Sequence, residues 1–273
     1  RNYGGERFGE LSLRQALAHS GNVITVKVLE TVGVPAFLEL AGRAGLPLHA
    51  RNGLSLALGT DEVALTELVQ AYTALAAGGT RAQARTIQRI YDRRRQVWIE
   101  NPPAGIGVMS PAAAFITTQM LKDVLVYGTA KSLRSFGEAH AAAGKTGTTD
   151  GARDAWFVGF TPNLVTGVWV GHDRPRPEGR GFTGGAIAAP IWEQFMKRAV
   201  AARPSGDFPR PDTVKALTVD ADTGLPAREG CPVKREAFFA SGTEPTEPCP
   251  RHEGEPVPLS ENPPETQGGA NLP

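Results

Sequence analysis

The strongest constraint on this chain is its density of glycine and proline. They supply 32 and 22 of the 273 residues, about a fifth of the chain where roughly 12% is usual. Turns must therefore be frequent, and a plain helical bundle is excluded. Thirteen of the 22 prolines follow Ala202. We expect a compact domain over residues 1–200 and a proline-rich extension over residues 201–273, partly ordered to about residue 250 and disordered beyond it.

Composition narrows the classes of partner. The 41% apolar content is enough to build a buried core. A formal net charge of +1 gives no field that would attract nucleic acid, so we expect no nucleic-acid partner. No run approaches the ~18 to 20 apolar residues that span a bilayer. The chain opens at Arg1 without a leader, so we interpret it as a piece of a longer protein whose membrane anchor would lie upstream.

Helical periodicity and end signals recur along the chain. Ser110-Pro111 supplies a capping serine and a proline at the first helical position, and Gly78-Gly79 ends another apolar helical pattern. His19-Ser20-Gly21 interrupts a third pattern, which predicts two helices joined by a short polar turn. The predicted helices cover residues 13–17, 22 to about 33, 62–77, 112–126 and 186–201.

Strand signals dominate elsewhere. Residues 85–91 and 96–99 alternate polar with apolar side chains around a charged turn, which predicts a hairpin. Three further β-like runs cover residues 141–149, 155–160 and 165–170, and the short link between the last two favours antiparallel pairing. Helices grouped before an antiparallel sheet, with one more helix after it, indicate an α+β architecture.

The segment Gly144-Lys145-Thr146 superficially matches a phosphate-binding loop. Position 139 is alanine rather than the required glycine, and the segment runs toward a turn and a strand instead of opening a helix. Nucleotide binding is therefore disfavoured. On a strand, Thr146 and Thr148 would project to one face, while Gly147 would leave room for a ligand alongside. Two hydroxyls near an ammonium would make a carboxylate-binding edge.

A second polar element, Ser20-Gly21-Asn22, lies between two predicted helices. Its hydroxyl and carboxamide could project into a cleft, and simple helix capping by Ser20 or Asn22 explains them equally well.

Taken in order, these elements resemble the penicillin-binding transpeptidase family, in particular the carboxy-terminal part of the transpeptidase domain of class A (bifunctional) penicillin-binding proteins. The likeness covers roughly residues 2–200 and continues more loosely through Gly242-Thr243. The stretches that carry it are Ser12-Leu13-Arg14-Gln15-Ala16-Leu17, Ser20-Gly21-Asn22 (S-x-N), Leu56-Ala57-Leu58-Gly59-Thr60, Ala71-Tyr72, Gly78-Gly79, Lys145-Thr146-Gly147-Thr148-Thr149, Asp154-Ala155-Trp156-Phe157-Val158-Gly159-Phe160, Gly184-Gly185 and Pro190-Ile191-Trp192.

The resemblance implies a β-lactamase/transpeptidase-like fold, here without the N-terminal part of the domain, and a D,D-transpeptidase that cross-links peptidoglycan stem peptides. It assigns catalytic roles to Ser20, Asn22, Lys145 and Thr148. It assigns substrate binding to Thr146, Gly147 and Thr149. The implied partners are stem peptides ending in D-Ala-D-Ala, β-lactams as inhibitors, and an upstream glycosyltransferase domain and membrane anchor. The implied location is extracytoplasmic, and no cofactor is expected.

One departure from the family pattern is the absence of S-x-x-K, which supplies the acylated serine and its lysine. No serine in the 273 residues is followed by lysine three positions later. We expect the motif to lie upstream of Arg1, and this chain alone to form no acyl-enzyme. Three alternatives stay open: a D,D-carboxypeptidase, a β-lactamase-like hydrolase, and a non-catalytic structural or partner-binding remnant.

The cysteines, Cys231 and Cys249, both lie in the proline-rich extension. A disulfide between them would stabilise this weakly packed region by about 3 kcal/mol in the chain-entropy model, and would imply an oxidising compartment. Two unpaired thiols are the alternative. No metal is expected, because the histidines and cysteines lack the usual ligand spacing.

Overall fold

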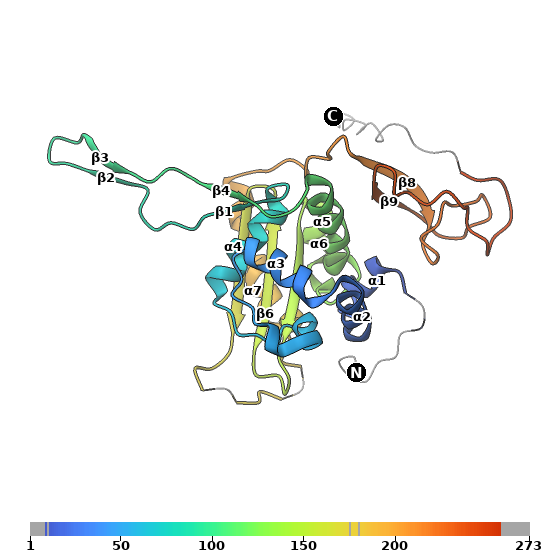
Figure 1. The fold of residues 1–273 in the computed structure, drawn as a ribbon, viewed down its shortest axis with the longest axis horizontal. Helices are drawn as coiled ribbons and strands as arrows, with labels where there is room; N and C mark the ends of the chain where they lie inside the picture. The colour runs from blue at the N-terminus through green and yellow to red at the C-terminus, as the bar shows by residue number, and fades with distance from the viewer. Residues whose placement is uncertain (1–8, 10, 175, 180, 258–273) are drawn as a thin grey trace, which may run out of the picture. The chain divides into compact units, whose positions relative to one another are not determined.

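The computed structural model describes residues 9, 11–174, 176–179 and 181–257. The chain divides into two compact units, residues 1–211 and residues 212–273, which are described separately (Figure 1).

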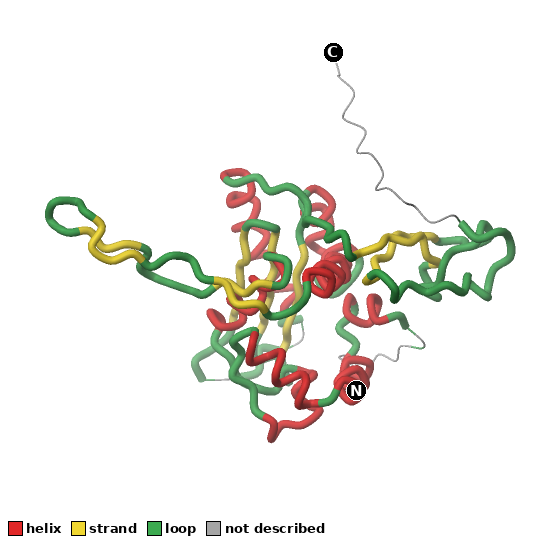
Figure 2. Tube along the Cα trace, turned by 45° about the horizontal axis from the view of Figure 1, so that its top comes forward, coloured by secondary structure: helices red, strands yellow, loops and turns green. Residues whose placement is uncertain are grey.

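The centre of the first unit is an antiparallel sheet of three strands in the order β5-β6-β7. The strands are β5 (Ala143–Thr148), β6 (Ala155–Thr161) and β7 (Leu164–Val170). This confirms the antiparallel arrangement predicted from the three apolar runs. In Figure 2 the strands lie side by side with helices around them.

The middle strand is buried by helices on both faces. Phe157 packs edge-to-face on Trp192, with ring centroids 5.2 Å apart. Phe160 lies on the opposite face of the strand and packs on Tyr72, with ring centroids 6.2 Å apart. Because both faces are covered, β6 is a continuous apolar run rather than an alternating one. This burial fixes the sheet and therefore the position of its edge strand β5.

The predicted helices are confirmed, with small shifts at their ends. Ser110 caps α5 through its side chain, which accepts from the backbone N–H of Ala113. The last predicted helix begins as a π-helical turn, η4. Helices α3 and α6 and the 3-10 segments η2 and η3 were not predicted. The helical elements are α1 (Leu13–Ala18), α2 (Asn22–Val32), α3 (Val34–Arg43), η2 (Ala50–Leu58), α4 (Leu65–Ala76), α5 (Pro111–Val126), η3 (Lys131–Leu133), α6 (Arg134–Ala139), η4 (Gly184–Ala188) and α7 (Ala189–Ala202).

The predicted hairpin is confirmed: β2 (Arg89–Tyr91) is shorter than predicted, β3 (Val97–Glu100) is shifted by one residue, and the two strands pair antiparallel. Its base is a second antiparallel pair, β1 (Thr80–Ala82) with β4 (Gly105–Gly107). Figure 1 draws the two pairs as one extended arm. Within the described ranges, no helix is long and apolar enough to cross a bilayer.

The second unit contains an antiparallel pair, β8 (Val214–Asp220) and β9 (Lys234–Ala240). Composition indicated partial order here without predicting these strands. The polar segment predicted to be disordered beyond about residue 250 falls largely outside the described residues.

Gly159 provides a test of how tightly the sheet packs on α7. A Cβ at this position would lie 2.7 Å from ring atoms of both Trp192 and Phe157. We expect Gly159→Ala to destabilise the first unit by about 1–3 kcal/mol through overpacking. Gly206→Ala is the matched control, because nothing lies within 4 Å of its added Cβ. Urea unfolding of both variants measures the difference, and equal stability would contradict the packing described.

Candidate active site

The corner between α1 and α2 presents Ser20. The Gly21 N–H donates to the Ala16 carbonyl at 2.8 Å, and the Ser20 N–H donates to the Leu17 carbonyl at 3.2 Å. This pair of bonds is the Schellman arrangement that ends many helices. Its left-handed position is usually occupied by glycine, but here it is Ser20, with φ of 54°. A serine in this conformation costs about 1–2 kcal/mol, so the hydroxyl is held at this corner against a local preference.

Packing on α5 fixes the corner. Arg14 of α1 forms a bidentate ion pair with the buried carboxylate of Asp123, to which the Tyr127 hydroxyl also donates at 2.6 Å. Beyond the helix end, the Thr129 N–H donates to the Ala18 carbonyl at 3.1 Å. A Cβ at Gly128 would collide with that same carbonyl. The α1 end and the loop after α5 therefore form one rigid support.

Strand β5 is an edge strand, and its side chains alternate between two faces. Lys145 and Gly147 share one face, and Thr146 and Thr148 share the other. The Thr149 N–H donates inward to the Asp154 carbonyl. Because the hydrogen-bonding direction alternates along an antiparallel strand, the N–H of Thr148 and the carbonyl of Thr146 point to the outer edge.

Lys145 joins the two elements. Its Nζ donates to Ser20 Oγ at 2.9 Å, across 125 residues of sequence, and to the Thr146 carbonyl at 2.9 Å. Burial lowers the pKa of Lys145 from its ordinary 10.5 to about 8, because an ammonium is disfavoured away from water. At pH 7 the group is still mostly charged, by about ten to one.

Both threonine hydroxyls have protein partners on the other face of β5. The Thr146 and Thr129 hydroxyls lie 2.6 Å apart. Thr148 Oγ1 accepts from the Gly184 N–H at 3.1 Å, and a Cβ on Gly184 would collide with the backbone of β5 and β6. Thr129 was not singled out from the sequence. Gly184 carried part of the resemblance, but its contact with Thr148 was not predicted.

The remaining predicted site residues lie nearby in different roles. Asn22 is the first residue of α2 and is half-buried. A Cβ on Gly147 would lie 3.1 Å from Cβ of its cross-strand neighbour Trp156, so a side chain at this position would crowd Trp156. The Thr149 hydroxyl donates to Asp154 Oδ2 at 2.8 Å and accepts from the Asp154 N–H at 2.9 Å. These two contacts close the β5–β6 turn through Thr149.

Comparison with known proteins identifies the family. The penicillin-binding protein transpeptidase domain matches residues 1–197, and the C-terminal domain of penicillin-binding protein 1A matches residues 210–254. The chain is 37% identical over 249 residues to penicillin-binding protein 1A of Aquifex aeolicus, covering 91% of this chain and 34% of that protein. The chain therefore belongs to the penicillin-binding protein transpeptidase family. It spans about a third of the length of the curated relatives it matches.

Solved structures give the same fold. Penicillin-binding protein 1A from Haemophilus influenzae aligns with a TM-score of 0.80 at 26% identity, over 91% of this chain and 42% of that one. The PonA1 protein of Mycobacterium tuberculosis, solved in complex with penicillin V, aligns with a TM-score of 0.66 at 26% identity, over 77% of this chain and 62% of that one. The β-lactamase/transpeptidase-like fold expected from the sequence is thereby confirmed.

The strain at Ser20 can be measured by comparing two substitutions. Ser20→Ala and Ser20→Gly both remove the hydroxyl that accepts from Lys145, but only glycine relieves the left-handed backbone. We expect Ser20→Gly to be more stable than Ser20→Ala by about 1 kcal/mol. Urea unfolding of the two variants gives this difference directly, and an alanine variant of equal stability would mean that the corner carries no strain.

The titration of Lys145 is a second measurable property. With the lysine ε-carbons ¹³C-labelled, one NMR signal should titrate near pH 8 and should disappear in Lys145→Arg. Lys197→Arg, at an exposed position paired with Glu193, is the control and should leave that signal in place.

The same shift has a consequence for stability. Between pH 8 and 10.5 the unfolded chain binds the extra proton, so the contribution of Lys145 to stability rises with pH across this window. A Lys145 signal that titrates above pH 10 would contradict the burial of its ammonium.

Proposed function

We propose that this chain is the part of a peptidoglycan D,D-transpeptidase that bears the S-x-N and K-T-G motifs. In this reaction a serine hydroxyl attacks the carbonyl of the D-Ala-D-Ala bond, and D-Ala leaves with a proton. An amine of a neighbouring stem peptide then attacks the acyl-enzyme ester, which restores the serine hydroxyl and forms the cross-link. Covalent catalysis of this kind divides one difficult acyl transfer into two easier steps.

The observation that carries the proposal is the 2.9 Å hydrogen bond from Lys145 Nζ to Ser20 Oγ at the edge of the sheet. A serine hydroxyl can accept one proton while it donates another. Ser20 is therefore suited to relay a proton toward the leaving or the incoming amine, with Lys145 supplying positive potential beside it. Placing a strained serine against a desolvated lysine costs stability, which is typical of functional sites.

The remaining roles follow from positions on and near β5. The outward N–H of Thr148 would form half of an oxyanion hole, and donors of this kind contribute about 3 kcal/mol to transition-state stabilisation. Thr146 and Thr148 would bind the terminal carboxylate of the donor peptide, exchanging their present hydroxyl contacts for it. Asn22, close to Ser20 at the start of α2, would hold the donor amide by hydrogen bonds.

The acylated serine would come from sequence outside these 273 residues, because none of their serines begins an S-x-x-K motif. The longer protein would carry this motif, a glycosyltransferase domain and a membrane anchor, and would act outside the cytoplasmic membrane, where its peptidoglycan substrate is assembled. β-Lactams would acylate the same serine, in keeping with the penicillin V bound by the related PonA1 protein.

Labelling with a fluorescent penicillin tests these roles in a chain extended upstream until it includes S-x-x-K. We expect labelling of the extended chain and none of the 273-residue chain. In the extended chain, Lys145→Ala should slow acylation by at least about tenfold, which corresponds to 1.4 kcal/mol. Lys197→Ala, on the exposed side of α7, should leave the rate unchanged. Equal rates for the two lysine variants would remove Lys145 from the site.

Thr148→Ala separates the two roles assigned to that residue. Its backbone donor is retained, so the oxyanion hole should persist while the carboxylate grip is lost. We expect a raised penicillin concentration at half-maximal rate, with a smaller effect on the maximal acylation rate.

The molecule that accepts the acyl group from the enzyme distinguishes a transpeptidase from the hydrolases of the same fold. Incorporation of an added amine into a D-Ala-D-Ala donor peptide supports transpeptidation. Release of D-Ala with water as the only acceptor would instead indicate a D,D-carboxypeptidase, and rapid turnover of penicillin would indicate a β-lactamase-like enzyme. A folded extended chain that never labels would leave a structural or partner-binding role.

A further inference from the structure

Four metal-ligating side chains converge inside the second unit. Asp220 ends β8, Cys231 lies in the loop that follows, and Cys249 and His252 lie three positions apart after β9. One ligand atom from each residue lies within 4.8 Å of the ligand atoms of all the others. We propose that these residues form a structural zinc site, named here the Cys₂HisAsp site.

The directions of the side chains support a shared centre. His252 Nδ1 lies 3.3 Å from Cys249 Sγ and 3.3 Å from Asp220 Oδ2. Donor atoms around a tetrahedral zinc ion are separated by about 3.3–3.8 Å, given Zn–S of about 2.3 Å and Zn–N or Zn–O of about 2.0–2.2 Å. The imidazole nitrogen, the carboxylate and the thiol therefore already stand near the separations that a bound ion requires.

Burial and donor chemistry favour zinc. The side chain of Asp220 is 2% exposed, and Cys231 and Cys249 are buried as free thiols. Buried cysteines normally behave as small apolar side chains, and such a pocket gives no reason to bring in a carboxylate and an imidazole. Two sulfurs, one nitrogen and one oxygen are a donor set that zinc accepts, and four protein ligands would close the site as in structural rather than catalytic zinc centres.

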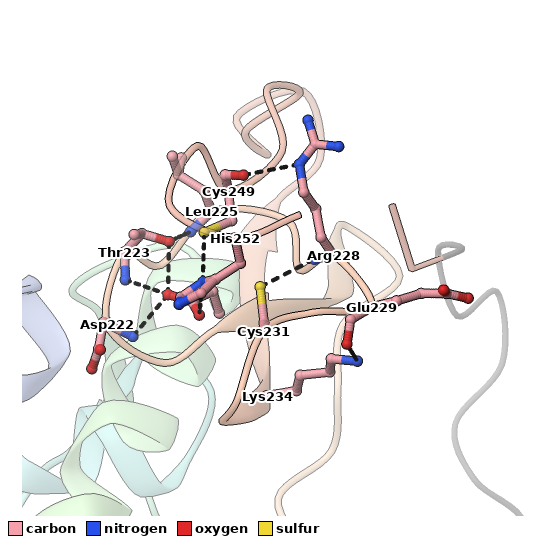
Figure 3. Close-up of polar contacts among 10 residues, drawn as sticks. Asp222, Thr223, Leu225, Arg228, Glu229, Cys231, Lys234, Cys249 and His252 are labelled. Carbon is pink, nitrogen blue, oxygen red and sulfur yellow. Dashed lines mark hydrogen bonds and ion pairs between the residues drawn. The ribbon is translucent and has the colours of Figure 1, made fainter. Parts of the chain in front are cut away.

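Surrounding hydrogen bonds orient the ligands. Oδ1 of Asp220 accepts from the N–H of Asp222 and from the N–H and hydroxyl of Thr223, at 3.1, 2.8 and 3.0 Å, which leaves Oδ2 facing His252. The Arg228 N–H donates to Cys231 Sγ at 3.2 Å. Figure 3 draws these contacts around the sulfurs. Outer contacts of this kind fix the direction of first-shell ligands in metal sites.

The backbone also brings the two cysteine segments together. The guanidinium of Arg228 donates to the carbonyls of Cys249 and Gly254, both at 2.9 Å. The Cys249 N–H donates to the Pro226 carbonyl at 2.8 Å. The apolar cluster at the site consists of Ala227 and the two cysteines, with Val257 packed against it, and β8 adds buried Val214, Ala216, Leu217 and Val219. Units of this size are often stabilised by a cross-link, and binding of zinc, with loss of the two thiol protons to solvent, would supply one.

Sequence spacing did not reveal the site, because its ligands come from three separate segments and only Cys249 and His252 are close in sequence. The disulfide predicted from the cysteine pair stays a rival explanation. It would use Cys231 and Cys249 alone, whereas zinc would also use Asp220 and His252. This difference decides the experiment.

The 273-residue chain is secreted to the periplasm of an expression host and isolated without reductant or chelator. We expect about one zinc per chain by elemental mass spectrometry, and two free thiols after denaturation in a chelator. Replacement of zinc by cobalt should give the visible absorption of a tetrahedral cobalt–thiolate centre, a measurement that needs no variant. A chain without zinc whose intact mass shows the Cys231–Cys249 disulfide would overturn the proposal.

Variants then separate ligation from disulfide bonding. His252→Ala keeps both cysteines, so it should lose the zinc and the cobalt spectrum. His49→Ala, at an exposed histidine of the first unit, should keep both. A chelator should lower the melting temperature of the wild-type chain and leave that of His252→Ala unchanged. Zinc bound equally by His252→Ala would show adventitious metal only and would also overturn the proposal.

Discussion

The candidate active site depends on one hydrogen bond, from the ammonium of Lys145 to the hydroxyl of Ser20. A desolvated ammonium requires a hydrogen-bond acceptor, and a serine on another element supplies one only if that element stays in place. The sheet holds Lys145 in place, because β6 is buried on both faces and keeps β5 in register. The contact between α1 and α5, through Arg14 and Asp123, holds Ser20 in place.

Two unfavourable contributions to the free energy of folding therefore coincide at the contact between Ser20 and Lys145. Ser20 adopts a backbone conformation that glycine prefers, and Lys145 is desolvated enough for its pKa to fall to about 8. Each cost is tolerated because the neighbouring contacts leave no relaxed alternative. Gly128 cannot carry a side chain beneath the end of α1, and Gly184 cannot carry one beside β5. These glycines allow close approach of backbones rather than flexibility, so substituting them would move the site.

Local signals predicted most of the fold, and long-range contacts account for what they missed. Ser110-Pro111 and the apolar runs of β5, β6 and β7 carry their own end signals, so these elements were predictable. Residues Lys145, Thr146 and Thr148 were assigned site roles through motifs, but the contact of Thr146 with Thr129 was not predicted, because nothing near position 129 in the sequence marks it. Gly147 and Thr149 were assigned to ligand binding by motif, and their contacts with Trp156 and Asp154 in the packing of β5 against β6 were not predicted.

Sequence signals predicted even less of the second unit, because its contacts join segments that are far apart in the sequence. The proline content predicted a loosely packed extension, because amino-acid composition alone does not show that two strands pair, as β8 and β9 do. A disulfide would fix only two points, the loop before β9 and the segment after it. A metal ion would fix a third, the end of β8, through Asp220, and with it the turn in which the N–H groups of Asp222 and Thr223 bind that carboxylate. Four ligands would therefore tie the segment after β9 to the connecting-loop end of the hairpin, where Asp220 pairs with Lys234, and this gives a physical reason for an imidazole and a carboxylate beside two buried thiols.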